Sequence, residues 1–424
     1  MKQMLKRLLP RRLVKPLLPL FHWLQAATAN LRYGLPARGL KVIAITGTNG
    51  KTTTAAFLGK ILEANGWSVG INSTAFYQIG KDVELNDTNM TVTDPFRLFG
   101  LLKRMKQARV DWVILETTSH ALSQSRISGI GVEVAAITNL TQDHLDYHGA
   151  MDTYAAAKGK LFQKKARFHV LNRDDEWFHF FDQFKPRERK FTYGTDADAE
   201  GRIIGAKLGP TGSKVVIKLE RAEIKPTIQL VGKFNAYNAL AAASIAHVLG
   251  VASETIEDGL EKLKNVPGRM ETVESKKGIK IIIDYAHTPD ALQNVLEALR
   301  GVAKKRIITV FGATGDRDKS KRPVMGKVVA RASDIAVLTD DDPYSENPIT
   351  IRSEVMAGLQ DVVDGAEIFE VGDRRGAIAK AIELARRGDT ILLAGIGHQS
   401  YRVIGDEKIE WNERQIAEEL LAKS

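Results

Sequence analysis

The sequence predicts an α/β fold in which a central parallel sheet of the P-loop type is followed by a second, doubly wound Rossmann-like domain. From about residue 40, apolar runs short enough for buried strands alternate with stretches of helical pattern. The first run, 42–45, leads directly into a turn of small residues and then into the start of a helix. A new series of strand-like runs begins at 279–283, beyond a sharp turn at 266–269. This repeated alternation is typical of parallel sheets covered by helices on both faces.

Composition places the chain among ordinary globular proteins. With 424 residues it is long enough for two or three domains, and its 44% hydrophobic and 26% charged residues are usual for such domains. There are no cysteines, which excludes disulfides, thiolate metal sites and a cysteine nucleophile. This composition fits a reducing compartment, so we expect a cytoplasmic protein.

The N-terminal segment, residues 1–39, is basic and rich in leucine. Six of the cations behind the formal charge of +10 fall at its start: Lys2, Lys6, Arg7, Arg11, Arg12 and Lys15. No apolar run is long enough to span a bilayer, and the pattern of a cleaved signal peptide is absent. Two interpretations stay open: a helix packed on the first domain, which we favour, or peripheral contact with an anionic membrane. The chain lacks the aromatic-studded basic motifs of nucleic-acid modules, so we expect no nucleic-acid partner.

The predicted elements of the first domain follow from the length and pattern of each run. Strands are expected at 42–45, 113–115, 134–137 and 168–171, with helices at 96–108 and 153–163. Residues 190–231 are rich in Thr, Gly, Ile and Val at alternating positions, which predicts a small antiparallel addition. An alanine-rich helix is expected from Asn238 to His247.

The second domain is predicted by a regular series of alternating elements. Strands are expected at 279–283, 307–311, 335–339, 367–371 and 390–394, with helices at 290–303, 321–332, 350–363 and 375–387. The chain then divides into an N-terminal segment at 1–39, a central domain at 40–268 and a C-terminal domain at 269–424.

The most informative stretch is the turn Gly47-Thr48-Asn49-Gly50-Lys51-Thr52-Thr53. A turn of this kind after a strand directs backbone N–H groups and a helix N-terminus at one point, which suits a phosphate. Lys51 can reach the β- and γ-phosphates, and the Thr52 hydroxyl can bind Mg²⁺. Ile45 stands where the usual P-loop has a glycine, so the match is to a shortened variant. The stretch predicts ATP as a cofactor.

Acidic and histidine side chains follow two of the neighbouring strands. Glu116 ends the strand 113–115, where its carboxylate can join a metal shell opposite the P-loop. The stretch 138–149 follows the strand 134–137 and contains several aspartates and histidines. Carboxylate oxygens suit Mg²⁺, whereas histidine is a less usual ligand. From the residues alone, this cluster is either a metal site or the polar capping of turns and helices.

Together these strings resemble the Mur ligase family. The matching strings stand in order from about residue 40 to the C-terminus: Thr46 to Thr54, Glu116 to Leu122 with Arg126, Tyr154 to Lys158, Phe234 to Leu240, Gly268 to Glu271, Asp284 to Asp290, Gly315 to Pro323 and Thr339 to Pro343. Within the family the pattern is most similar to the UDP-N-acetylmuramoyl-tripeptide synthetase type. The resemblance implies ATP-dependent amide ligation, in which a carboxylate takes the γ-phosphate of ATP and the resulting acyl phosphate is attacked by an amino acid's amine.

The resemblance also implies a role for individual residues. The catalytic residues would be Lys51, Lys158, His144 and Arg269, and the metal side would be formed by Thr52, Glu116, His144 and a carbamylated Lys158. Nucleotide contacts would come from the P-loop and from Asn235, Asn238, Arg269 and Asp284. Substrate contacts would come from Thr91, Ser119, Arg126, Arg317, Asp341, Asp342, Tyr344, Gly395 and Gln399. The implied partners are a muramyl peptide and an amino acid, bound by a monomer.

Three departures from the family pattern bear on the substrates. Only about forty residues precede the ATP loop, too few for the family's UDP-binding domain, so the acceptor is linked either to UDP or to a lipid. Tyr344 follows the Asp-Asp-Pro string where enzymes that add diaminopimelate have an arginine, and Gln399 replaces a glutamate near the C-terminus. Diaminopimelate is therefore disfavoured, and the amino acid stays unresolved. A polyglutamate-like acceptor and a non-catalytic ATP-binding scaffold are the remaining alternatives.

Overall fold

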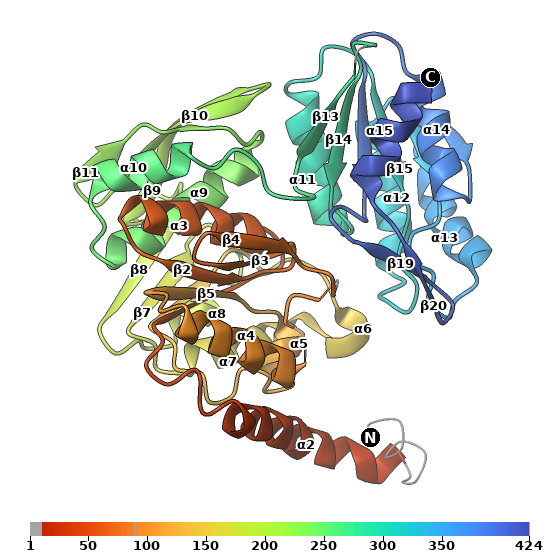
Figure 1. Cartoon of the computed structure of the whole chain (residues 1–424). Helices are drawn as coiled ribbons and strands as arrows, with labels where there is room; N and C mark the ends of the chain where they lie inside the picture. Colours follow the sequence, from red (N-terminus) through yellow and green to blue (C-terminus); the bar gives the residue numbers. More distant parts are fainter. Residues whose placement is uncertain (1–10, 89, 93, 276, 424) are drawn as a thin grey trace.

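The computed structural model describes residues 11–88, 90–92, 94–275 and 277–423. Figure 1 shows two bodies, each built on its own sheet, and a long N-terminal helix at the end of the first body. Of the basic N-terminal residues, Lys2, Lys6 and Arg7 lie outside the described residues. The two sheets confirm the predicted α/β class.

The first sheet contains twelve strands within the described residues, and β1 lies at its centre. The strands are β1 (Val42–Thr46), β2 (Val69–Asn72), β3 (Phe76–Ile79), β4 (Asp82–Leu85), β5 (Trp112–Glu116), β6 (Val134–Ile137), β7 (Phe168–Asn172), β8 (Arg189–Gly194), β9 (Gly201–Gly209), β10 (Gly212–Leu219), β11 (Ala222–Ile224) and β12 (Thr227–Ile228). Their order is β11-β10-β9-β8-β7-β6-β1-β5-β2-β3-β4, and β12 pairs with β10. The strands from β2 to β8 through β1 are parallel, which brings their carboxyl ends to one edge.

The antiparallel addition predicted at 190–231 is only partly right. Strand β8 pairs in parallel with β7, so it belongs to the parallel sheet, and antiparallel pairing begins between β9 and β10. The short helix α8 (Phe178–Asp182) lies between β7 and β8, and a crossover of this kind returns the chain in the same direction. The addition therefore extends the first sheet instead of forming a separate one.

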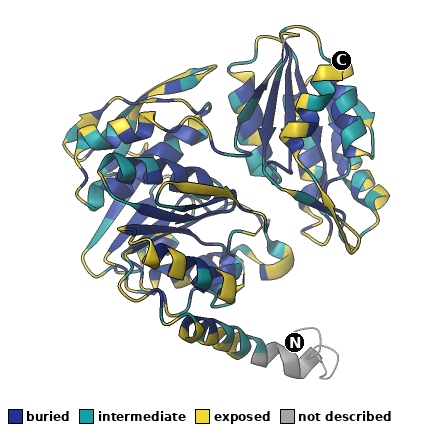
Figure 2. Cartoon of the chain, in the orientation of Figure 1, coloured by how far each residue is buried: buried dark blue, intermediate teal, exposed yellow. Residues whose placement is uncertain are grey.

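Helices cover both faces of the first sheet because the buried strands are apolar on both sides. Ile43 and Ile45 face α3 (Lys51–Ala64), α9 (Lys233–Val248) and α10 (Ser253–Glu261). Val42 and Ala44 face the other layer, which includes α4 (Pro95–Gln107), α7 (Met151–Phe162) and α8. Two short helices, α5 (Ser119–Ser123) and α6 (Leu145–His148), follow β5 and β6. Figure 2 shows this sheet buried between its helices.

The second body confirms the doubly wound sheet. Its strands are β13 (Glu271–Glu274), β14 (Lys280–Asp284), β15 (Ile307–Phe311), β16 (Ile335–Leu338), β17 (Glu367–Glu370) and β18 (Thr390–Ala394), in the order β13-β14-β18-β15-β16-β17. All neighbours pair in parallel except β13, which is antiparallel to β14. One face packs on α11 (Pro289–Arg300), α12 (Lys321–Ala332) and α13 (Pro348–Gln360), and the other on α14 (Arg374–Leu384) and α15 (Glu413–Lys423). A small hairpin, β19 (Tyr401–Ile404) and β20 (Glu407–Glu410), precedes α15.

The N-terminal helix α2 (Arg11–Arg32) packs on the first body, as the favoured interpretation expects. Ala26 and Ala29 are fully buried in the same apolar cluster as residues of α4. Within the described part of the chain, no helix combines the length and the apolar character needed to cross a membrane.

Candidate functional site

The P-loop sits at the carboxyl end of β1, at the centre of the first sheet. Gly47 has φ 147° and Gly50 has φ 84°, a backbone region that L side chains rarely adopt. A Cβ on Gly47 would lie 1.8 Å from Thr138 Oγ1, and one on Gly50 would lie 2.2 Å from Asn238 Oδ1. Helix α3 begins at Lys51, so the N–H groups of its first turn point into the loop. Only glycine fits these two positions, and the loop can bind a phosphate closely.

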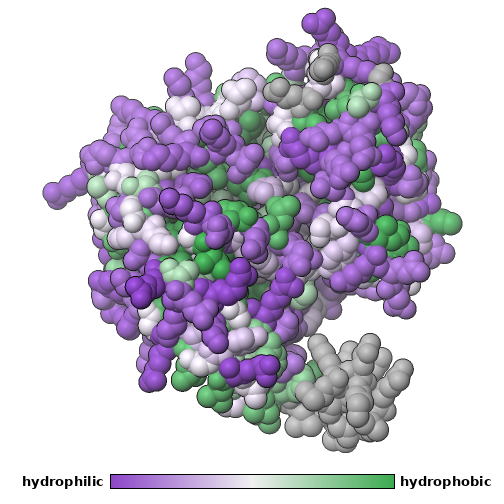
Figure 3. Space-filling view, in the orientation of Figure 1, coloured by the Kyte–Doolittle hydropathy of each residue, from purple (hydrophilic) through white to green (hydrophobic). Residues whose placement is uncertain are grey.

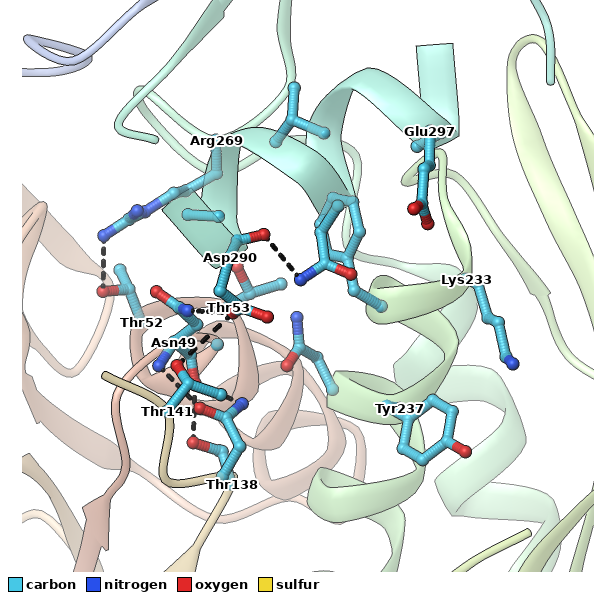
Figure 4. Close-up of a pocket in the computed structure, with 18 of the residues that line it drawn as sticks. Asn49, Thr52, Thr53, Thr138, Thr141, Lys233, Tyr237, Arg269, Asp290 and Glu297 are labelled. Atoms are coloured by element: carbon cyan, nitrogen blue, oxygen red, sulfur yellow. Dashed lines mark hydrogen bonds between the residues drawn. The ribbon is translucent and has the colours of Figure 1, made fainter. Parts of the chain in front are cut away.

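A cavity of about 560 Å³ lies on one side of the P-loop, between the two bodies. The predicted nucleotide residues on its wall are Asn49, Gly50, Thr52, Thr53, Asn238, Arg269 and Asp284. Helix α11 of the second body adds Asp290, Asn294 and Glu297, and α9 adds Lys233 and Tyr237 (Figure 4). The cavity is large enough for a nucleotide, and its walls come from both sheets.

A second cavity, of about 410 Å³, lies on the other side of the same loop. The predicted residues on its wall are Thr48, Lys51, Thr91, Glu116, Arg126, His144, Arg317, Asp341, Asp342, Tyr344, Gly395 and Gln399. Asn49, Gly50, Thr52 and Arg269 line both cavities. The phosphate loop therefore separates two adjoining binding spaces.

Four predicted residues lie behind these walls. Gly47 and Lys158 are in contact with each other, since Lys158 Nζ donates a hydrogen bond of 2.7 Å to the Gly47 carbonyl. Asn235 is buried beneath Asn238, whose amide donates to Asn235 Oδ1 at 3.1 Å. Ser119 is buried as well, with its hydroxyl 3.0 Å from His148 Nε2. In this structure they support the wall residues rather than face the cavities.

The Glu116 carboxylate lies beside the Thr52 hydroxyl, the other oxygen predicted for the metal side. It ends β5, which pairs with β1, so the register places it opposite Ile45 just before the P-loop. Thr52 Oγ1 donates to Glu116 Oε2 at 2.9 Å, and Lys51 Nζ lies 4.0 Å from Glu116 Oε1. Thr74, which sequence reasoning missed, donates to the same carboxylate through its N–H and its hydroxyl, both at 2.8 Å.

The oxygens of Thr52 and Glu116 fit a magnesium ion. Among the described residues, no group of three or more His, Asp and Glu side chains could hold a metal by itself. Magnesium does not need such a group, because it usually keeps several waters and is bound by one or two carboxylates with substrate phosphates. A hydroxyl and a carboxylate 2.9 Å apart beside a phosphate loop are such a donor set.

Lys158 lies directly behind the P-loop, on α7. It is 1% exposed, and burial and the nearby Lys51 lower its pKa well below the ordinary value for lysine. Its Nζ lies 4.6 Å from the centre of the Tyr154 ring. The lowered pKa favours the neutral amine, which is the form that reacts with carbon dioxide.

His144 and Asp143 form a second polar group on the wall of the second cavity. Burial lowers the pKa of His144 to about 3, so its ring is neutral at physiological pH. Burial alone would raise the pKa of Asp143, but the Lys321 charge and the hydrogen bond from the His144 backbone N–H oppose it, and the pKa lies below its usual range. Lys321 comes from α12 and reaches Asp143 Oδ1 at 3.8 Å. This contact joins the two bodies, and neither Asp143 nor Lys321 was predicted as a site residue.

Further contacts between the bodies surround the P-loop. Asn49 Nδ2 donates to Asp290 Oδ2 at 2.6 Å, and Arg269 donates to Thr52 Oγ1 at 3.4 Å (Figure 4). His398 Nε2 lies 2.8 Å from the carbonyl oxygen of Thr74. Asp290 stands inside the matching string Asp284 to Asp290, which was the available signal, and His398 stands next to Gln399, whereas Thr74 lies outside all the matching strings. The bodies are therefore in contact on both sides of the loop.

Asp284 provides a test of these electrostatics. Burial raises its pKa from 3.8 to about 6, although the Arg269 charge opposes the shift. The neutral form favours the folded state, so this stabilisation is present below pH 4 and is lost as the pH rises through 6. We expect Asp284→Asn to remove a pH-dependent term of up to about 3 kcal/mol from the free energy of unfolding. Urea unfolding of both proteins at pH 4 and pH 7 measures it, and an equal difference at both pH values would contradict the assignment.

Comparisons with known proteins agree with this geometry. The Mur ligase middle domain matches residues 45–246, and the Mur ligase glutamate ligase domain matches residues 268–397. A UDP-N-acetylmuramoyl-L-alanyl-D-glutamate–2,6-diaminopimelate ligase from Syntrophomonas wolfei subsp. wolfei is 38% identical over 393 residues, which cover 92% of this chain and 80% of that protein.

Solved structures give the same result. The structure of a UDP-N-acetylmuramoyl-L-alanyl-D-glutamate–2,6-diaminopimelate ligase is similar with a TM-score of 0.64 and 28% identity, covering 96% of this chain and 83% of that chain. Mycobacterium tuberculosis folylpolyglutamate synthase, solved with ADP and AMPPCP, is similar with a TM-score of 0.70, covering 88% of this chain and 92% of that chain. At 17% identity, that second likeness concerns the fold alone.

Proposed function

This chain belongs to the Mur ligase family, and from that premise we propose that it joins an amino acid to the carboxylate of a UDP-MurNAc-peptide-like acceptor in peptidoglycan precursor synthesis. The observation that carries the proposal is the single phosphate loop shared by two cavities. ATP would bind in the first cavity with its γ-phosphate at the P-loop, where it would face an acceptor bound in the second cavity. The arrangement suits a reaction that moves a phosphoryl group between two bound substrates.

The reaction has two steps that this geometry supports. A carboxylate oxygen of the acceptor attacks the γ-phosphorus, the bond to the β-phosphate oxygen breaks, and ADP leaves. The amine nitrogen then attacks the carbonyl carbon of the acyl phosphate, the amide bond forms, and phosphate leaves as the nitrogen loses its proton. Lys51 and Arg269 line the second cavity beside the loop, where both steps place negative charge on oxygen.

The metal side would assist the first step. Thr52 and Glu116 would hold the magnesium ion, which would neutralise charge on the phosphate oxygens. We also propose that Lys158 is carbamylated, which would place an anionic group behind the loop. Its low pKa and burial support this, because the neutral amine is the reactive form. We propose that the protein acts as a monomer, because residues of one chain line both cavities. We also propose that it acts in the cytoplasm, which the lack of cysteine fits.

The identity of the added amino acid depends on the polar groups that line the second cavity. Asp341 and Gln399 belong to that lining, and Asp341 Oδ2 and Gln399 Oε1 are buried atoms that find no hydrogen-bond donor among the described residues. Asp342 lies beside Asp341, and burial and that neighbouring carboxyl raise its pKa. An ammonium group carries the donors that Asp341 Oδ2 and Gln399 Oε1 lack. We therefore propose an amino acid whose side chain ends in an ammonium group without a second carboxylate.

Phosphate release tests the function and the specificity together. The reaction would contain ATP, Mg²⁺, UDP-MurNAc-L-Ala-D-Glu and one amino acid from a panel with lysine, ornithine, diaminopimelate, alanine and glutamate. We expect release that needs both the UDP-dipeptide and a diamino monocarboxylic acid. Release with diaminopimelate alone would contradict the proposed side-chain class. If no phosphate is released with any amino acid of the panel while ATP still binds, the result would favour a lipid-linked or polyglutamate-like acceptor.

Removing residues 1–38 is expected to leave ATP binding unchanged within about twofold. The described residues that line the ATP cavity begin at Asn49, so the deletion removes none of them. Calorimetric titration with a non-hydrolysable ATP analogue measures the affinity, and circular dichroism checks the fold. A folded deletion variant that no longer binds the analogue would show that the segment belongs to the nucleotide-binding unit.

A further inference from the structure

The charge of the chain is concentrated at its N-terminus. The first acidic residue of the sequence is Glu63. Residues 1–41 contain these cations and no acidic residue: Lys2, Lys6, Arg7, Arg11, Arg12, Lys15, Arg32, Arg38 and Lys41. A one-sign field of this kind attracts an anionic surface at a range of about 10 Å at ordinary salt.

Helix α2 of the same segment presents an apolar face that the protein does not cover. Ala26, Ala29 and Asn30 are buried against the first body. Other apolar side chains of the helix are exposed: Leu20 by 54%, Trp23 by 49%, Leu24 by 47% and Leu31 by 67%. Leu20, Leu24 and Leu31 follow the spacing i, i+4, i+11, so they lie along one line of the helix. Figure 3 shows hydrophobic surface at this end of the molecule, beside the residues drawn in grey.

The combination of this apolar line with a basic segment identifies one kind of partner. Leucine and tryptophan on one face of a helix enter the boundary between headgroups and acyl chains, and lysine and arginine bind anionic headgroups. A nucleic acid would bind the cations, but the leucines and Trp23 would stay exposed to water. Among the described residues, α2 included, no helix is both long and apolar enough to cross a bilayer.

We propose that the N-terminal segment with α2 docks this protein on the surface of a bilayer that contains anionic phospholipids. The exposed leucines and Trp23 enter the interface, and the positive charge of the segment attracts the anionic headgroups. Both cavities are lined only by residues from Thr48 onwards among those described, so a docked molecule keeps its substrate sites free. This inference goes beyond the ligase reaction and does not depend on it.

Vesicle flotation tests the proposal with the full chain. The protein would be mixed with vesicles of phosphatidylcholine alone, or of phosphatidylcholine with 30 mol% phosphatidylglycerol, at about 50 mM and 500 mM salt. We expect flotation with the anionic vesicles at low salt, and a loss of about tenfold or more in the bound fraction at high salt or with neutral vesicles. The double variant Trp23→Ala/Leu24→Ala is expected to lose about tenfold in apparent affinity.

A matched control comes from the second body. Ile349 and Val363 are 63% and 88% exposed, so Ile349→Ala/Val363→Ala removes exposed apolar area far from α2 and should float like the wild type. A second readout uses the unmodified chain: brominated phosphatidylcholine in anionic vesicles should quench the Trp23 fluorescence, and Trp23→Phe should remove that quenching. This readout remains valid even if the double variant fails to fold.

Four results would overturn the proposal. The first is a folded wild-type protein that does not float with anionic vesicles at low salt. The second is flotation that the α2 variant and the control lose equally. The third is light scattering that shows a dimer dissociated by the α2 variant, and the fourth is binding to DNA without binding to vesicles. Either of these last two results would assign the surface to another partner.

Discussion

Replacing Lys51 with alanine is expected to lower kcat by about 10³-fold while ATP binding falls much less. Lys51 is the cation of the loop shared by both cavities, and its Nζ is held by a 2.8 Å hydrogen bond to the Thr48 carbonyl. A preorganised cation contributes most where negative charge develops during reaction, and removing one such group costs 10²–10³-fold or more. Phosphate release under saturating substrates measures the change.

Lys60→Ala is the matched control for this prediction. Lys60 lies on the same helix α3, more than two turns beyond Lys51, and pairs with Glu63 at 2.8 Å on a partly exposed surface. Its loss should leave kcat unchanged within about twofold, since surface pairs of this kind contribute little. If Lys51→Ala turned over ATP as fast as Lys60→Ala, the loop would not carry the reaction.

The second large effect is expected for Lys158→Ala, which should lower kcat by at least about 10²-fold. As the proposed carbamate, this residue would supply negative charge behind the loop, next to the Gly47 carbonyl that its Nζ contacts at 2.7 Å. Carbamates lose carbon dioxide on protonation, so bicarbonate should partly restore wild-type preparations that have lost activity at acidic pH. The variant should not respond to bicarbonate.

Carbon-13 NMR separates the modification from a merely structural role. Protein incubated with ¹³C-bicarbonate should show a carbamate signal in the wild type and in Lys160→Ala, an exposed neighbour on α7. Lys158→Ala should lack the signal. Full activity of Lys158→Ala, or a carbamate signal that survives the substitution, would remove this residue from the proposed role.

Much of the fold could be predicted because its strands are short apolar runs and its helices are longer amphipathic ones. The run 42–45, the glycine turn and the second series of strands from 279 are local patterns, and each is present where expected. The pairing of β8 could not be predicted with equal certainty. Its alternating residues suit either direction of pairing, and the direction is set by the crossover through α8.

The proximity of the P-loop and Glu116 could be predicted from the sequence. Each stands at the end of a predicted strand, and parallel pairing of these two strands brings them together. The Lys321 contact with Asp143 depends instead on how the two bodies meet, which no local pattern records. Thr74 contacts Glu116 through a backbone N–H and a common hydroxyl, groups that carry no sequence signal of their own.

The shared wall of the first cavity has a consequence for unfolding. Each body has its own apolar clusters, on the two faces of its own sheet, so each can unfold as a separate cooperative unit. A nucleotide that contacts α9 and the P-loop on one side and α11 on the other adds its binding energy only while both bodies are intact. With the nucleotide bound, the two bodies should therefore unfold in one calorimetric transition. Without it, each body can unfold in a transition of its own.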